Sequence, residues 1–224
     1  NIRWVDQEDG PIKLYRLPEK KKPYVIGGDT AGDGSDYFVG QVIDNTTGRQ
    51  VAKLRHQMDE DVYARQMYCL GMAYNKALLG VETNFSTFPV KELARLGYHR
   101  QFVREQEDTY REGHKKAFGF RTDSLTRPIV IAGLIETLRG HYDLIEDEET
   151  LLEMLTFVRN PKSLRPEAEP GAHDDCVMAL AITYYVRNQQ DMTAAGEELE
   201  GAEWTGDMWE DYYGADEAGR QYLI

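Results

Sequence analysis

The chain reads Gly171-Ala172-His173-Asp174-Asp175-Cys176-Val177-Met178-Ala179-Leu180-Ala181 towards its C-terminal end, and this stretch decides the fold. Two adjacent carboxylates, Asp174 and Asp175, open an apolar run that leaves a helix there almost no polar face. Ionised carboxylates beside a buried helix are costly unless something cationic meets them. The stretch therefore predicts a buried helix over 173–186 with a cation at its start.

Two further acidic residues stand where apolar strands are predicted to end. Asp29 follows the run 24–26, and Glu82 follows the run 78–81. Three acidic sites that are far apart in sequence can converge on hard divalent ions, which take oxygen ligands. That is the layout of a two-metal site that cleaves phosphodiesters. Each residue also has a simpler interpretation, Asp29 as a turn residue that caps nearby amides and Glu82 as a solvent-exposed strand end.

The order of the predicted elements describes an α/β protein. Three strands joined by tight turns suit a meander, and later strands that alternate with helices suit parallel addition. This predicts a ribonuclease H-like (resolvase-like) mixed sheet of about five strands flanked by helices. The first and fourth strands would be neighbours, which puts Asp29 beside Glu82. Strands are predicted at 24–29, 36–44, 50–56, 78–82 and 99–103, helices at 59–77, 88–96, 122–138, 148–155 and 173–186, and an irregular loop or hairpin at 156–170.

Composition and charge divide the 224 residues into three parts. Residues 1–22 are expected to be a linker or lead-in, 23–190 the core domain, and 191–224 an acidic tail that contains aromatic residues. The tail holds ten acidic side chains and one Arg, a net charge of −9 out of −13 for the chain. The rest is close to neutral once metal-site carboxylates are set aside, so we expect weak intrinsic affinity for DNA.

Other bulk features narrow the class of protein. The longest apolar run, 129–135, is too short to span a bilayer, so no membrane partner is expected. Two cysteines in predicted helices indicate buried thiols rather than a disulfide framework. The chain starts with Asn1 instead of Met, which we interpret as a fragment of a longer protein.

Several segments resemble the C-terminal nuclease domain of the tailed-bacteriophage terminase large subunit. The resemblance implies a ribonuclease H-like, Holliday-resolvase-like fold and metal-dependent cleavage of concatemeric double-stranded viral DNA during packaging, in the cytoplasm of the infected bacterial host. It also implies a terminase ATPase domain before Asn1, and the portal and the small terminase subunit as partners. The segments appear in family order and span about residues 24–187; they are 27–37, Val81-Glu82-Thr83-Asn84, 122–131 with Thr126-Arg127-Pro128, 156–160 and 171–181.

The resemblance also implies roles for the acidic residues and predicts Asp29, Glu82 and Asp175 as catalytic. Asp29 would bridge two divalent ions, Mg2+ or Mn2+, and Glu82 would bind one of them and position the attacking water. Asp174 and Asp175 point about 100° apart on a helix, and both faces are apolar, so periodicity does not choose between them. Similarity to resolvase-like enzymes favours Asp175 as the main ligand, with Asp174 as a second ligand or as the helix N-cap. His173 would contact phosphate or a metal-bound water, or would face the solvent.

Four basic residues, Lys115, Lys116, Arg121 and Arg127, would contact DNA phosphates at the mouth of the site, or would form an ordinary solvated face. Two other classes of protein fit part of the pattern. An actin-like phosphotransferase shares the sheet, but it should show further Gly-rich loops after residue 175, and none is present. A non-catalytic DNA-binding or assembly module would keep the fold, but three intact carboxylate sites argue against it.

Overall fold

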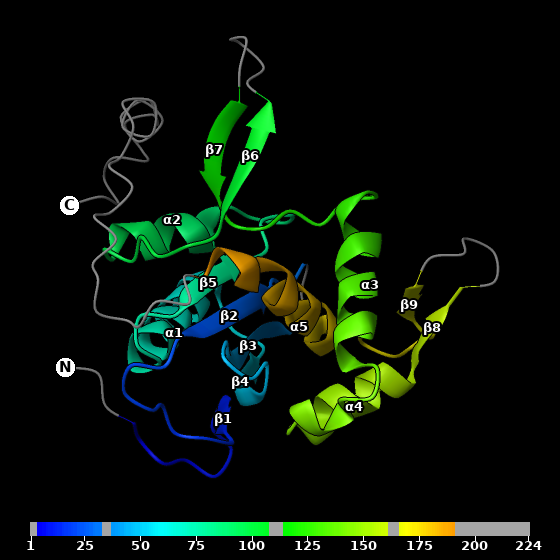
Figure 1. The fold of residues 1–224 in the computed structure, drawn as a ribbon. Helices are drawn as coiled ribbons and strands as arrows, with labels where there is room; N and C mark the ends of the chain where they lie inside the picture. The colour runs from blue at the N-terminus through cyan, green and yellow to red at the C-terminus, as the bar shows by residue number, and fades with distance from the viewer. Residues whose placement is uncertain (1–3, 33–36, 108–113, 161–165, 191–224) are drawn as a thin grey trace.

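The computed structural model describes residues 4–32, 37–107, 114–160 and 166–190, so the predicted tail at 191–224 lies outside the described residues. A five-stranded mixed sheet forms the centre, in the order β1-β4-β3-β2-β5 (Figure 1). The strands are β1 (Ile12–Leu14), β2 (Tyr24–Asp29), β3 (Phe38–Asp44), β4 (Gln50–His56) and β5 (Leu78–Val81). This confirms the predicted fold class.

The meander of β2, β3 and β4 forms as predicted. Both pairings within it are antiparallel and join strands that are neighbours in sequence, with Val25 opposite Ile43 and Gln41 opposite Lys53. The turn between β3 and β4 is closed by Gly48, whose φ is 78° and whose N–H donates to the Asp44 carbonyl. A positive φ is easily adopted only by glycine, which explains the turn's position.

A first strand lies within residues 1–22, the segment that is expected to be a linker or lead-in. Residues 12–14 pair antiparallel with β4, Ile12 opposite Leu54 and Leu14 opposite Ala52, and make β1 an edge strand of the sheet. Two of its three residues are exposed, so its sequence lacks the buried alternation that marks a strand.

The parallel part of the sheet differs from the prediction in one strand. Helix α1 (Glu60–Ala73) leads into β5, which runs parallel to β2, and α2 (Phe88–Arg95) follows. The strand predicted at 99–103 is reduced to a single parallel bridge between Leu79 and Gln101. The chain then leaves the sheet as the hairpin β6 (Val103–Glu107) and β7 (His114–Phe118), which projects from the body in Figure 1.

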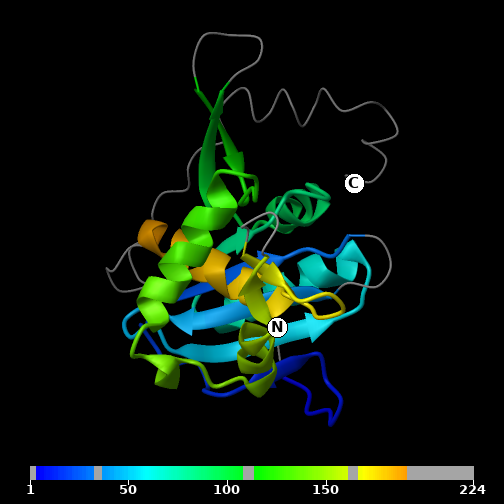
Figure 2. The same cartoon turned by 90° about the vertical axis from the view of Figure 1, so that its right-hand side faces the viewer.

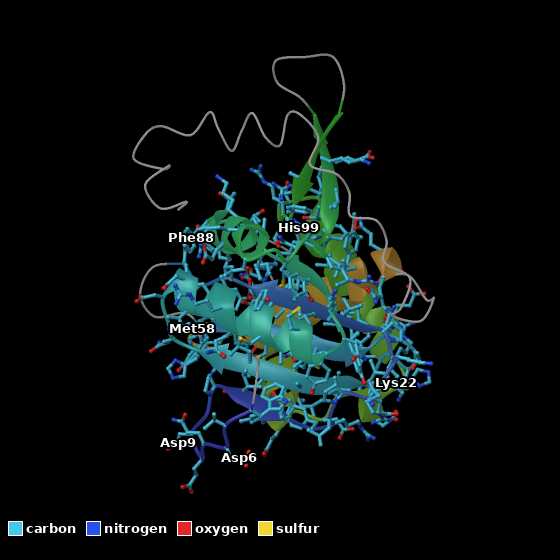
Figure 3. All side chains as sticks on the ribbon, turned by 90° about the vertical axis from the view of Figure 1, so that its left-hand side faces the viewer. Asp6, Asp9, Lys22, Met58, Phe88 and His99 are labelled. Atoms are coloured by element: carbon cyan, nitrogen blue, oxygen red, sulfur yellow. The ribbon has the colours of Figure 1, made fainter. Side chains whose placement is uncertain are left out.

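Helices cover both faces of the sheet. One face packs on α1, with Met67 and Tyr63 in the same buried cluster as Ile26 and Val81. Figure 3 shows α1 lying across this face, with Met58 just before its start and Phe88 at the start of α2. The other face packs on α5 (Asp175–Val186), which is itself covered by α3 (Thr126–Leu138), as Figure 2 also shows. The predicted core helix over 173–186 is thus confirmed, with ten of its residues buried.

The segment between α3 and α5 also follows the prediction. Pro128 lies in the first turn of α3, where its missing N–H costs nothing. Helix α4 covers Glu148–Leu155, as predicted, and Asp147 caps it by accepting the Thr150 N–H at 2.7 Å. The hairpin β8 (Phe157–Arg159) and β9 (Pro166–Ala168) then leads to α5. Among the described residues, no helix is long and apolar enough to cross a membrane.

A buried ion pair joins α4 to the sheet. Lys53 on β4 is 1% exposed, and its Nζ lies 2.6 Å from Oδ2 of Asp147, which is 2% exposed. Burial alone would raise the pKa of Asp147, but hydrogen bonds from Lys53, Thr150 and Tyr15 outweigh burial and hold that pKa below its usual range. Each charge is therefore stabilised by the other and by its hydrogen bonds.

Replacing Lys53 with Met is expected to destabilise the fold by about 3–5 kcal/mol at pH 7, because the Asp147 carboxylate loses its buried partner. A depressed pKa contributes stability above the unfolded value of about 3.9, and this contribution is lost as the pH falls through the folded value. The difference in unfolding free energy between the parent and the variant should therefore be smaller at pH 3 than at pH 7. Urea unfolding at both pH values measures it. Arg65→Met, which removes an exposed 4.0 Å pair, is the control and should cost under about 1 kcal/mol.

Candidate active site

Two carboxylates meet at one edge of the sheet. Asp29 is the last residue of β2, and Glu82 comes directly after β5. These strands are parallel, with Gly28 opposite Val81, and the Glu82 N–H donates to the Gly28 carbonyl at 2.8 Å. The two acidic residues are therefore neighbours at the carboxyl ends of adjacent strands, as the predicted strand order requires.

Glycines two residues upstream show which face of the sheet carries these carboxylates. A side chain at Gly27 would run into Thr183 and Ala179 of α5, and one at Gly80 would meet Val186 at 2.8 Å. Side chains two residues apart on a strand share a face. Asp29 and Glu82 therefore both belong to the face on which α5 packs.

Helix α5 brings the third acidic site to the same edge. Cys176, in its first turn, packs against Val39, which is the register partner of Asp29. Asp175 directly precedes Cys176 and is the first residue of the helix. The start of α5 thus lies over the end of β2, and the structure brings together the predicted residues Asp29, Glu82, Asp174 and Asp175.

The electrostatics of Asp29 reflect this convergence. Burial raises the pKa of Asp29 well above its usual range, and the Glu82 carboxylate raises it further by charge and by a hydrogen bond between the two side chains. The charges of Asp175 and Asp174 act in the same direction. The buried Tyr63 donates its hydroxyl to the Val39 carbonyl at 2.9 Å. Burial raises the pKa of Tyr63, and the charges of Asp29 and Glu82 raise it further. Close carboxylates that cannot all ionise are stabilised by a cation.

Asp174 occupies the N-cap position of α5, but its side chain makes no capping hydrogen bond. It pairs instead with Arg127 of α3, Nη2 to Oδ2 at 2.5 Å. The capping acceptor comes from another helix, because Glu153 of α4 accepts the N–H groups of Cys176 and Val177 at 2.8 and 3.3 Å. Asp174 is therefore the N-cap residue of α5, as considered, but its side chain does not supply the cap, and sequence reasoning missed Glu153, which no local motif marks.

His173 lies next to the acidic pair. Its Nδ1 is 3.6 Å from Oδ2 of Asp175, and its ring meets the Tyr37 ring edge-on, with the centroids 5.8 Å apart. The Tyr37 ring is covered on one side by the Arg55 guanidinium, 3.4 Å from the ring centroid. Nearly half of the His173 side chain is exposed, so it can reach a ligand in solution.

The basic residues divide into several environments. Lys116 on β7 and Arg121 after it are exposed, Arg127 is held by Asp174, and the side chain of Lys115 lies outside the described part of the chain. Sequence reasoning missed Arg104 on β6, whose Nη1 donates at 3.0 Å to the Thr83 hydroxyl, beside Glu82. Burial lowers the pKa of Arg104, and the nearby charge of Arg121 lowers it further. Arg104 and Arg121 therefore form a cationic pair on the Glu82 side of the site.

The donors fit a divalent metal ion in their chemistry. Within the described ranges, no group of three or more His, Cys, Asp or Glu side chains is already arranged to hold a metal ion. Burial and the neighbouring carboxylates nevertheless raise the pKa of Asp29, and a bound cation would offset the repulsion between these charges. Carboxylate oxygens are the ligands that Mg2+ and Mn2+ prefer.

Comparison with solved structures places the fold. The large terminase nuclease from thermophilic phage G20c superposes with a TM-score of 0.60 at 21% identity, over 80% of this chain and 90% of that one. The chain has the fold of large-terminase nuclease domains. The same G20c nuclease with bound magnesium gives a TM-score of 0.61 at 19% identity over 80% of this chain and 89% of that one. The Thermus phage P74-26 large terminase nuclease domain superposes with a TM-score of 0.57 at 21% identity, over 80% of this chain and 86% of that one.

Comparison of the amino-acid sequence finds no match. No family model matches the chain, and no curated protein matches it at a significant level. The large-terminase nuclease fold is ribonuclease H-like, which agrees with the predicted class. At about 20% identity the likeness establishes the fold, and the activity has to be argued from the side chains.

Proposed function

We propose that this chain is a metal-dependent endonuclease that cuts concatemeric double-stranded viral DNA during genome packaging. One observation carries the proposal: Asp29, Glu82 and the acidic pair of α5, from three distant parts of the sequence, meet at one edge of the sheet. The large-terminase nuclease fold supports it, since the G20c nuclease of this fold has been solved with bound magnesium, cobalt and zinc.

The proposed ligands are Asp29, Glu82, Asp174 and Asp175. Divalent ions held by these residues would supply Lewis-acid chemistry, which activates an attacking water and stabilises charge on the leaving 3′ oxygen. Asp29 offers two oxygens from the centre of the cluster and would be shared between the ions. Glu82 would bind on one side and orient the water through its remaining oxygen. Asp175 would close the opposite side from the start of α5.

Cationic residues would hold the DNA around this cluster. Lys116 and Arg121 are exposed on the hairpin side, and Arg104 lies beside Thr83 next to Glu82. His173 would contact a phosphate from the α5 side. Lys115 remains a proposed contact. Arg127 would neutralise the negative charge of Asp174 in the free protein and would pair with a DNA phosphate instead when DNA binds.

The setting follows from the same proposal. The chain would act in the cytoplasm of the infected bacterial host, with the terminase ATPase domain, the portal and the small terminase subunit as partners. The actin-like alternative gains no support, since the similar structures named above are nucleases. A non-catalytic module would leave the carboxylate cluster without a purpose, because close like charges cost stability.

The chain is expected to nick and linearise plasmid DNA in Mn2+ or Mg2+, with little sequence preference. Ca2+ should bind without supporting turnover, because its larger and more flexible coordination sphere does not match that of Mg2+. Agarose gels of supercoiled plasmid over a metal titration measure both. Cleavage that continues undiminished in EDTA would rule out the metal-dependent mechanism.

A further inference from the structure

Glu153 is a buried carboxylate for which the proposed chemistry has no role. It lies on α4 with only 7% of its surface exposed. Its Oε2 accepts two backbone N–H groups of α5, from Cys176 at 2.8 Å and from Val177 at 3.3 Å. These are the second and third residues of the helix, so Glu153 supplies from another element the cap that the Asp174 side chain does not give.

The position of this cap connects it to the carboxylate cluster. Asp174 and Asp175 immediately precede the two amides that Glu153 holds. The direction of both side chains depends on how the first turn of α5 is wound, and that turn has no capping side chain of its own. Glu153 therefore fixes the backbone from which both proposed ligands project.

Helix α4 is itself firmly anchored, so Glu153 is a rigid support. Asp147 caps its start and bonds to the buried Lys53 on β4 at 2.6 Å. Thr150, one turn before Glu153, accepts a hydrogen bond from Gln41 of β3 at 3.0 Å. The start of α4 is thus tied to two central strands of the same sheet that carries Asp29.

We propose that Glu153 is a positioning residue of the carboxylate site: it orients the side chains of Asp174 and Asp175 by holding the first turn of α5. This inference rests on the proposed function, since it takes the acidic pair to be metal ligands. Residues that orient metal ligands typically contribute 10- to 100-fold to metal affinity.

The test measures Mn2+ binding to the full chain by calorimetry without DNA, and plasmid nicking separately at saturating Mn2+. Glu153→Ala should weaken Mn2+ binding about 10- to 100-fold. Glu153→Gln, whose amide oxygen still accepts both N–H groups, should recover most of the affinity even though it removes the charge. Recovery by Gln separates an orienting role from a purely electrostatic one.

A matched control separates positioning from general damage to the fold. Glu92 on α2 is also 7% exposed, and its carboxylate bonds to Arg95 of its own helix. Glu92→Ala should lower the melting temperature without changing Mn2+ affinity. If Glu153→Ala does not fold, Glu153→Asp, whose shorter side chain cannot reach both amides, takes its place with the same expectation.

The outcomes distinguish the two proposals. If the parent chain binds Mn2+ and Glu153→Ala, or Glu153→Asp in its place, binds it equally well, the positioning role is overturned and the proposed function stands. If the parent chain binds no Mn2+, the positioning role and the proposed function are both overturned. Weakened binding in Glu92→Ala as well would show that loss of stability alone explains the effect, and would also overturn the positioning role.

Discussion

Asp29→Asn is expected to abolish plasmid cleavage and, without metal, to melt at a higher temperature than the parent chain. Asp29 lies at the centre of the carboxylate cluster, so losing one charged ligand removes several kcal/mol of transition-state stabilisation. A loss of about 4 kcal/mol corresponds to about a thousandfold in rate. Asp175→Asn should lose cleavage to a similar extent.

The rise in melting temperature follows from the raised pKa of Asp29. Above about pH 4 the unfolded chain ionises this carboxyl freely, whereas the folded chain keeps its proton until a higher pH. The folded state therefore binds more protons over that interval, and the stability contributed by Asp29 falls as the pH rises. Asparagine carries no such cost, so the gain should be present at pH 8 and absent near pH 4.

Melting curves at both pH values in EDTA, and single-turnover cleavage in Mn2+, measure the two effects. Asp61→Asn is the control, because Asp61 is an exposed carboxylate on α1 whose nearest cation, Arg65, is 4.0 Å away. It should leave both properties unchanged. Cleavage by Asp29→Asn within about tenfold of the parent, a difference of only about 1.4 kcal/mol, would show that Asp29 is not a ligand.

Gly27→Ala is the second substitution with a large expected effect, and it acts through packing alone. A Cβ at this position would lie 2.5 Å from the Thr183 backbone nitrogen and 2.6 Å from the Ala179 carbonyl oxygen. Both are backbone atoms of a buried helix and cannot rotate away. Overpacking of this kind costs about 3 kcal/mol or more, which in a chain of this size lowers the melting temperature by about 10 °C.

The same substitution should also damage the site, since α5 must move away from β2 and carries Asp174 and Asp175 with it. Differential scanning calorimetry and Mn2+ affinity measure the two consequences. Gly133→Ala on α3 is the matched control, because nothing lies within 4 Å of its new Cβ. It should stabilise the helix by up to about 1 kcal/mol. An unchanged melting temperature in Gly27→Ala would contradict the close packing of α5 on β2.

The sequence predicts elements well where burial dictates the pattern. The central strands lie close to the predicted bounds because they are short apolar runs bounded by turn residues, and α4 does too. Gly48 closes the turn after β3, and Pro128 lies in the first turn of α3. β1 escapes prediction because two of its three residues are exposed and a neighbouring strand alone makes it a strand. The segment 99–103 ends in Phe102 and Val103, which favour a strand, but it forms only one bridge to β5.

The site is predictable to the extent that sheet topology controls it. Asp29 and Glu82 meet because their strands are parallel neighbours, which the order of the elements already implies. The partners of Asp174 and of the α5 amides are set by tertiary packing across 47 and 23 residues, to Arg127 and Glu153 respectively. Local spacing carries no information at that range, so neither contact can be predicted from the sequence pattern.

The Glu82 N–H donates to the Gly28 carbonyl between two paired strands, whereas Asp174 and Asp175 lie at the start of a helix. The backbone around the four acidic residues should therefore open at different rates. Amides in central strands exchange with solvent only when a large unit of the protein opens, whereas the first turn of a helix opens by local fraying. Asp29, at the end of β2 between β3 and β5, therefore belongs to the slowest-opening part of the molecule, whereas the first turn of α5, with Asp174 and Asp175, opens once its two hydrogen bonds to Glu153 break. Any rearrangement that lets a metal ion or DNA enter would then take place on the helix side, while the strand side stays as a fixed template.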